Sequence, residues 1–253
     1  MRSSNPALKA DIFLDSGTGA MLRRDPGAMT LNGTVNKTGL LLLLAVLTAA
    51  WSWQASLGPM GEMLPAGRLY LIGGAIGGFV LALVTIFKTQ WAPVTAPLYA
   101  LVEGLFLGAV SAMYEARFDG IVLQAVILTF GTLFALLAAY RSGLIRATEN
   151  FKLGVAAATG GIALVYLATI VLGLFGINIP YIHESGLIGI GFSLFVVVIA
   201  ALNLVMDFDF IESGVEGGAP KYMEWYGAFG LMVTLVWLYL EFLRLLSKLQ
   251  SRD

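Results

Sequence analysis

The sequence predicts an all-α integral membrane protein with seven transmembrane helices, and three observations carry that prediction. Apolar and aromatic residues make up 58% of the 253 residues, and the mean hydropathy is +0.84. Charged residues make up only 12%, against about 25% in a soluble domain. Seven separate apolar segments have a length close to the roughly 17–25 residues that a bilayer-spanning helix needs.

The same composition excludes several classes of function. The formal net charge of -1 argues against nucleic-acid binding, which requires a strong basic excess. The chain has no cysteine, so it has no disulfide, thiol nucleophile or thiolate metal site. Its one histidine, His183, is expected in a solvated loop and cannot build a histidine-rich metal site or a credible catalytic triad. We therefore expect neither an enzyme nor a bound cofactor.

The chain divides into a polar tail over residues 1–38, a transmembrane domain over 39–248 and a short tail over 249–253. The first tail lacks the apolar core of a signal peptide, so no cleavage is expected. The connections between the apolar segments are short, which predicts antiparallel neighbours. The predicted spans cover residues 39–56, 69–87, 94–114, 121–140, 153–175, 186–211 and 226–246.

Basic residues in the connections predict which side each end of the chain occupies. The side of the N-terminus carries nine of them: Lys9, Arg23, Arg24, Lys37, Lys88, Arg141, Arg146, Lys152 and Lys221. The other side carries five: Arg68, Arg117, Arg244, Lys248 and Arg252. This bias predicts a cytoplasmic N-terminus and, with seven spans, a C-terminus on the opposite side.

Small residues in two spans predict close helix packing. Pairs of glycines four residues apart occur at Gly73, Gly74, Gly77 and Gly78 in the second span and at Gly104 and Gly108 in the third. Such pairs let helix backbones approach closely where lipid supplies no hydrophobic drive. We expect them to serve packing within the chain rather than dimerisation.

Ionisable residues inside apolar spans are costly and are functional candidates by default. At the end of the sixth span, Asn203 and Asp207 lie one helical turn apart and share a face, whereas Asp209 is turned away. Asp207 is therefore the better candidate for a buried acid, and Asp209 with Glu212 is expected to face the headgroups or a loop. Whether the helix ends before or after Asp207 decides whether this acid lies in the membrane or at its edge.

The last span carries a second candidate acid. Glu241 shares a stripe with Thr234 and Leu238, and the helix that carries it should be the most enclosed, because the acid must be shielded from lipid. If Asp207 and Glu241 face each other, sharing one proton relieves their repulsion and splits their titration into two steps. Ionised, the pair would separate or accept a hard cation such as Ca²⁺, which prefers oxygen ligands.

A structural alternative assigns these residues no role in gating. Glu241 then pairs with Arg244, three residues further along the same helix face, and Asp207 caps the sixth helix at the membrane interface. Glu103, in the third span, has no charge partner within its own span. It is either protonated or paired across helices, as a structural element or as part of an ion path.

Several of these features together resemble the Bax inhibitor motif family. They are the seven spans, Glu103-Gly104 early in the third, Asp207-Phe208 at the end of the sixth, and the Leu-Tyr-Leu-Glu-containing run over residues 238–246. Residues 5–9 and 29–34 are similar to its bacterial branch. The resemblance covers nearly the whole chain. The chain departs from the family pattern at Glu241, where aspartate is usual, in the long linker over 213–225 and in the extended N-terminal region.

The resemblance implies six helices wrapped around a central seventh, in a cell inner (plasma) membrane. It also implies a pH-sensitive calcium leak gated by two acids, one in each of the last two helices, which match Asp207 and Glu241 here. A non-transporting membrane adaptor that regulates proteases or stress and cell-death responses remains the alternative. A small-solute or proton transporter is a third hypothesis, although the seven spans show no clear two-half repeat.

Overall fold

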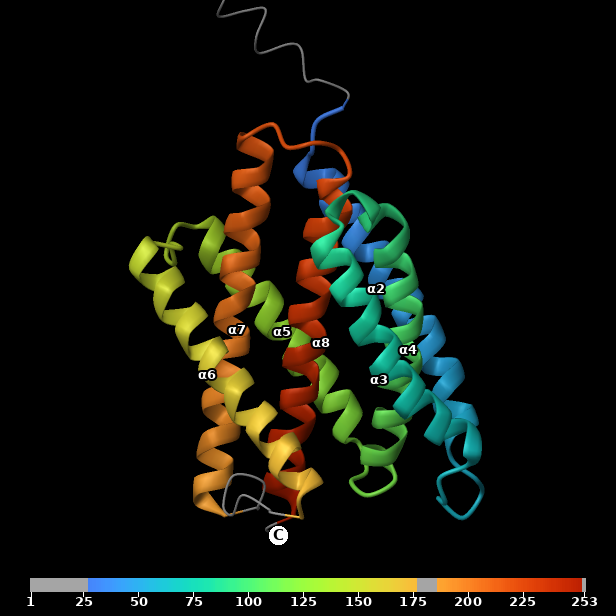
Figure 1. The fold of residues 1–253 in the computed structure, drawn as a ribbon. Helices are drawn as coiled ribbons and strands as arrows, with labels where there is room; N and C mark the ends of the chain where they lie inside the picture. The colour runs from blue at the N-terminus through green and yellow to red at the C-terminus, as the bar shows by residue number, and fades with distance from the viewer. Residues whose placement is uncertain (1–26, 177–185, 252–253) are drawn as a thin grey trace, which may run out of the picture.

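The computed structural model describes residues 27–176 and 186–251, and this part of the chain folds into seven long helices with no strand (Figure 1). All seven are long and apolar enough to cross a membrane. A short 3-10 helix, η2 (Thr89–Trp91), precedes the third long helix. The long helices are α2 (Leu31–Ser56), α3 (Pro65–Phe87), α4 (Ala92–Glu115), α5 (Ile121–Arg141), α6 (Glu149–Leu174), α7 (Leu187–Glu216) and α8 (Met223–Gln250). His183 and the residues before 27 lie outside the described part.

Local sequence explains where several helices begin. The side chains of Thr30 and Thr148 accept hydrogen bonds from the backbone N–H groups three residues on and so cap α2 and α6. Pro65 opens α3, where its missing N–H costs nothing. Because Thr30 caps it, α2 begins eight residues before the expected residue 39. At the same end of the bundle α7 continues to Glu216, so Asp207 lies well inside a helix.

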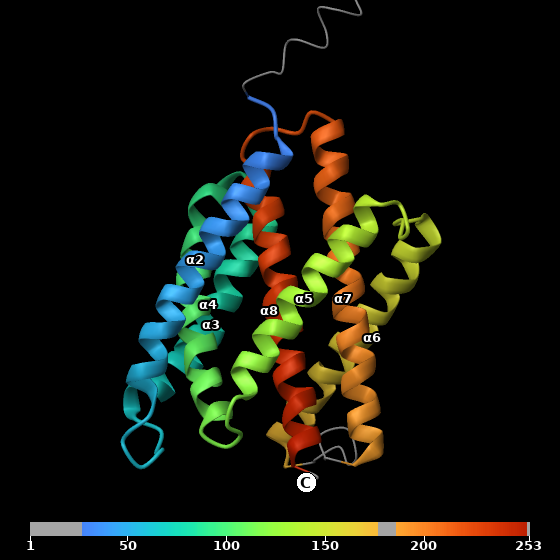
Figure 2. The same ribbon diagram turned by 180° about the vertical axis from the view of Figure 1, so that it is seen from behind.

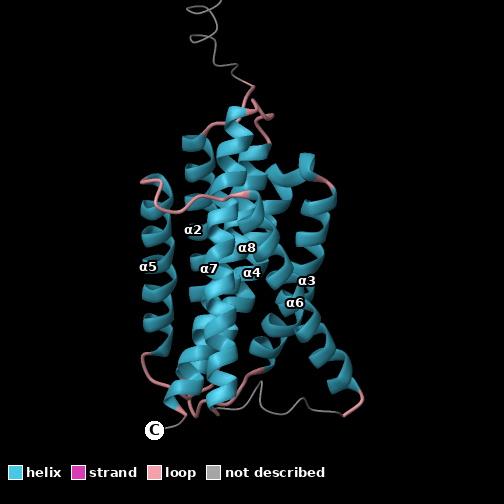
Figure 3. Cartoon of the chain, turned by 90° about the vertical axis from the view of Figure 1, so that its left-hand side faces the viewer, coloured by secondary structure: helices cyan, strands magenta, loops and turns pink. Residues whose placement is uncertain are grey.

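Helix α8 lies at the centre of the bundle. It packs directly against α2, α4, α5 and α7, and more of its apolar window is buried than in any other described span. Helix α3 lies outside α2 and α4, and α6 lies outside α7. Figures 1 and 2 show α8 between these two groups, and Figure 3 shows it between α4 and α7 from the side. The expectation that the last span is the most enclosed is confirmed.

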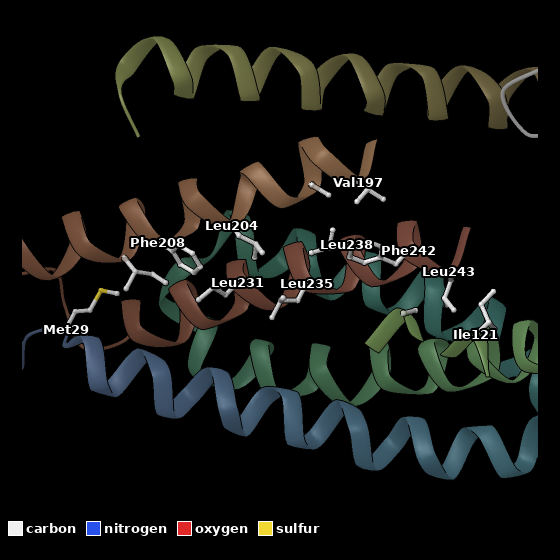
Figure 4. Close-up of a cluster of buried hydrophobic side chains, with 13 residues drawn as sticks. Met29, Ile121, Val197, Leu204, Phe208, Leu231, Leu235, Leu238, Phe242 and Leu243 are labelled. Carbon is white, nitrogen blue, oxygen red and sulfur yellow. The ribbon is translucent and has the colours of Figure 1, made fainter. Parts of the chain in front are cut away.

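The core consists largely of side chains packed between α7 and α8 (Figure 4). Leu204 and Phe208 of α7 are buried together with Leu231, Leu235 and Leu238 of α8. Lipid tails are as apolar as these side chains, so complementary packing rather than exclusion from water holds the helices together.

Glycines bring α2, α3 and α4 into close contact. A Cβ on Gly104 or Gly108 would overlap the backbone of Ala45 or Ala49 in α2, and a Cβ on Gly74 would overlap Phe106. The expectation that these glycines pack the helices of one chain together is confirmed at these three positions.

Candidate functional site

Asp207 projects from α7 toward the central helix. Thr234 of α8 lies beside the Asp207 side chain, and Asp207 Oδ1 lies 4.0 Å from the place where a Cβ on Gly230 would stand. The other oxygen, Oδ2, is buried and has no hydrogen-bond partner among the described residues. The missing side chain at Gly230 thus leaves room for a carboxyl group beside α8.

Glu241 lies in a second polar cluster, nearer the C-terminal end of α8. Its Oε1 accepts hydrogen bonds from Arg244 Nη1 at 2.6 Å and from the Tyr166 hydroxyl of α6 at 2.9 Å. Arg244 Nη1 also donates to the Tyr166 oxygen at 2.6 Å, and the guanidinium lies 5.0 Å from the centre of the Tyr166 ring. Glu241 is 1% exposed, and its Oε2 is buried without a partner among the described residues. The predicted Glu241–Arg244 pair is confirmed.

The two acids do not form the directly bonded pair that the sequence suggested. Each has its own partners, and Thr234, the α8 residue beside Asp207, precedes Glu241 by seven residues. At 1.5 Å per helical residue this places the two carboxyl groups about 10 Å apart along α8. The expectation of one shared proton is therefore corrected to two separate acids: Glu241, which is buried, and Asp207, which is half-buried with its Oδ2 enclosed. The alternative in which Asp207 caps the sixth helix is also wrong, because α7 continues past it.

The other polar residues of α7 serve different neighbours. The Asn203 amide donates hydrogen bonds to Thr159 Oγ1 of α6 and to the Ile199 carbonyl, both at 2.8 Å. It therefore ties α7 to α6 and does not support Asp207. Asp209 forms an ion pair at 2.8 Å with Lys152, near the start of α6. Its expected position toward a connection is confirmed.

Glu103 lies apart from both acids, between α3 and α4. It is 8% exposed, and a Cβ on Gly78 of α3 would overlap its carboxylate. None of the ion pairs among the described residues includes Glu103. The structure therefore does not bring it to the α7–α8 face.

Comparison with known protein families decides the relationship that these features suggested. Residues 5–251 match the family model described as Bax inhibitor 1 like. The chain belongs to that family. Comparisons with curated proteins and with solved structures returned no match. The family resemblance predicted from the seven spans and their motifs is confirmed over nearly the whole chain.

Three further polar residues of the interior could not be predicted from the sequence. Tyr166 is the one tyrosine of its apolar span, and nothing in the sequence marks it as a partner of Glu241. Lys248 is 5% exposed and donates to the Gly189 carbonyl and to Ser193 Oγ of α7. Glu224 is fully buried. An isolated acid next to a turn is expected to be solvated, so the burial of Glu224 could not be predicted from the sequence.

Glu224 joins the start of α2 to the start of α8. It forms ion pairs with Lys37 and Lys221, and its Oε1 accepts hydrogen bonds from the backbone N–H and the hydroxyl of Thr30 at 2.9 and 2.8 Å. The backbone of Met29 also donates to the Ala219 carbonyl at 2.7 Å. This cluster fastens the entry of the first helix to the connection between α7 and α8.

No group of three or more His, Cys, Asp or Glu side chains within residues 27–176 and 186–251 is arranged to hold a metal ion. Asp207 and Glu241 were predicted as calcium ligands. Because they lie apart, each could offer a cation only one carboxylate of its own in this conformation.

Proposed function

We propose that this protein is a proton-regulated cation leak, with Ca²⁺ as the physiological cargo, whose path follows the α7–α8 face. Asp207 and Glu241 are two successive cation-binding positions on that path. The observation that carries this proposal is that each acid keeps one buried oxygen without a hydrogen-bond partner among the described residues. Leaving a buried polar group unsatisfied costs about 1–3 kcal/mol, and more for a charge.

Unsatisfied carboxylates in a span have a direct use in cation transport. Buried intramembrane acids characteristically mark ion and proton paths. Ca²⁺ binds oxygen ligands, and carboxylates are the strongest of these. Protonation of Asp207 removes a charge that attracts the ion, so flux is expected to rise with pH. The burial of both unpartnered oxygens supports the further proposal that the path is closed in this conformation.

Arg244 acts in this proposal as a tethered counter-ion. It holds Glu241 at 2.6 Å, and Tyr166 of α6 holds the same carboxylate oxygen. A cation must displace the guanidinium or use the remaining oxygen, Oε2. Lys248 follows Arg244 by one turn of α8 and adds a second positive charge near Glu241. The positive charges of these basic residues oppose the passage of a cation at Glu241. The neighbour of Asp207 on α8 is the neutral Thr234, so this part of the path lacks such a barrier.

We also propose that the N-terminus is cytoplasmic and that the bilayer is a cell inner (plasma) membrane. Among the described residues Lys37, Lys88 and Lys221 lie toward the end of the bundle where α2 begins, as do the basic residues of the α5–α6 connection. The positive-inside rule assigns this end to the cytoplasm. Reporter fusions at residue 38 and at the C-terminus are expected to report opposite sides of the membrane. Two reporters on one side would contradict an odd number of spans.

The test of function is Ca²⁺ flux into vesicles that contain the purified protein and a calcium indicator, measured from acidic to alkaline pH. Wild-type flux should exceed that of empty vesicles and rise with pH. Asp207→Asn should lower the flux at alkaline pH by about tenfold, the equivalent of roughly 1.4 kcal/mol, and flatten its pH dependence. Glu241→Gln should also flatten it. Asp209→Asn is the matched control, because Asp209 pairs with Lys152 at a helix end, and it should conduct like wild type.

The adaptor function remains the alternative, and the closed Glu241–Arg244–Tyr166 cluster favours it because such a cluster can serve stability alone. Wild-type vesicles that conduct no more than empty ones would contradict the leak. Equal flux in wild type, Asp207→Asn and Glu241→Gln would show that neither acid lies on the path. Either result would leave the acids with a structural role and favour an adaptor.

A further inference from the structure

An apolar cleft opens on the membrane-facing side of the bundle. Its volume is about 270 Å³, larger than the 150 Å³ or so of an engineered apolar cavity that stays dry and binds benzene. Helices α2 and α5 form its opposite walls and scarcely touch each other. Figure 2 shows α5 crossing in front of α8, with α2 to the left. Val46 of α2 and Val126 of α5 lie on its rim and are 59% and 36% exposed, so the cleft is open to lipid.

The hydroxyl groups in this cleft are already satisfied. The Ser111 and Tyr239 hydroxyls form a hydrogen bond with each other at 2.6 Å, and the Thr129 hydroxyl donates to the Ala125 carbonyl at 2.7 Å. What remains for a ligand is aliphatic and aromatic surface. A hydrocarbon chain suits such a lining, and a polar solute does not.

Both cavities of this region are lined by α4 and α8, and we call the contact between these two helices the seam. The second cavity is polar, has a volume of about 400 Å³ and lies one helical turn further along the seam. Ser111 of α4 lines the first cavity and Tyr114 lines the second, which is about 4.5 Å along the helix. Arg117, Arg244 and Lys248 line the second cavity, and no carboxylate is among its described lining residues. The nearby acid Glu115 is turned away, since it accepts hydrogen bonds from the backbone N–H groups of Gly120 and Val122.

The two arginines are suited to an anion at the membrane surface. Arg117 lies just beyond the end of α4 and is exposed. Arg244 uses Nη1 for its bonds to Glu241 and Tyr166, and its side chain is 34% exposed. The remaining donors of its guanidinium are available to a phosphate, which this group binds in a bidentate manner.

We propose that this seam binds one anionic glycerophospholipid, with its phosphate between Arg117 and Arg244 and an acyl chain in the cleft between α2 and α5. The adjoining apolar and cationic cavities match the two ends of such a lipid. A zwitterionic lipid offers the same chain, but its own cation meets the positive charges of the polar cavity.

Binding can be measured by native mass spectrometry of the delipidated full-length protein with phosphatidylglycerol or phosphatidylcholine. Wild type should retain one phosphatidylglycerol with about tenfold preference, corresponding to roughly 1.4 kcal/mol. Arg117→Gln should remove most of that preference, and Arg117→Lys should restore part of it. Arg68→Gln is the control, because Arg68 is an exposed arginine on the same side of the bundle that lines neither cavity. It should bind like wild type.

The acyl chain is tested separately with Val126→Phe, which narrows the mouth of the cleft. This variant should bind phosphatidylglycerol several-fold more weakly and leave the response to glycerol phosphate, a headgroup without chains, unchanged. Equal binding of both lipids, or equal losses in Arg117→Gln and Arg68→Gln, would overturn the proposal. Glycerol phosphate that binds as tightly as the whole lipid would show a simple anion site. If Val126→Phe does not fold, the comparison of whole lipid with glycerol phosphate still decides this point. None of these readouts depends on cation flux.

Discussion

Removing Arg244 tests whether the buried ion pair at the centre of the bundle stabilises it. Breaking a buried pair by deleting one partner costs about 3–5 kcal/mol, because the other charge remains buried. Glu241 is nearly inaccessible, but Arg244 is 34% exposed, so solvent screening reduces the loss. We expect Arg244→Gln to lower the free energy of unfolding by about 2–3 kcal/mol. Glu241→Gln should cost about 1 kcal/mol, because the remaining arginine reaches water and Tyr166.

The assay is reversible unfolding in mixed micelles for wild type, both single variants and the double variant. The double variant should cost about 1–2 kcal/mol less than the sum of the singles, which is the signature of direct contact. Glu149 and Lys152 provide a matched control, since they form an exposed pair with the same three-residue spacing. Glu149→Gln should cost less than about 0.5 kcal/mol. Additive losses at Glu241 and Arg244 would refute the buried pair.

Two further predictions concern stability. Glu224→Gln should cost about 2–3 kcal/mol in the same assay, because the fully buried carboxylate pairs with two lysines; a loss below 0.5 kcal/mol or so would mean that the cluster contributes nothing. Gly108→Ala should be destabilising, because its Cβ would overlap the Ala49 carbonyl. Gly131→Ala has open space and should gain about 0.5–1 kcal/mol from helix propensity. Equal effects at both glycines would contradict the close approach of α2 and α4.

The fold followed from the sequence because a bilayer imposes a length and a composition on every span. The enclosure of α8 was also predictable, since an acid such as Glu241 cannot face lipid cheaply. The Glu241–Arg244 pair followed from spacing on one helix face. These predictions use only local geometry, and they hold wherever the span lies in the bundle.

The relative positions of Asp207 and Glu241 along the bundle axis could not be predicted, because they depend on where α7 ends. The helix runs to Glu216, five residues beyond the expected end at 211, and each residue adds 1.5 Å. The resulting register places Thr234 rather than Glu241 beside Asp207. Tyr166 escaped prediction for a related reason, since only the packing of α6 against α7 brings its hydroxyl to Glu241.

The most direct test of the central claim is whether water and cations reach the face of α8 beside Asp207. The chain has no native cysteine, so a single Thr234→Cys variant in vesicles can be treated with a cationic, membrane-impermeant thiol reagent. Val233→Cys is the control, because Val233 is 36% exposed on the outer surface of α8 whereas Thr234 is buried. The account predicts labelling of Thr234→Cys that increases with pH, and no labelling of Val233→Cys. A Thr234→Cys variant that stays unlabelled at every pH would contradict a cation path along α7 and α8.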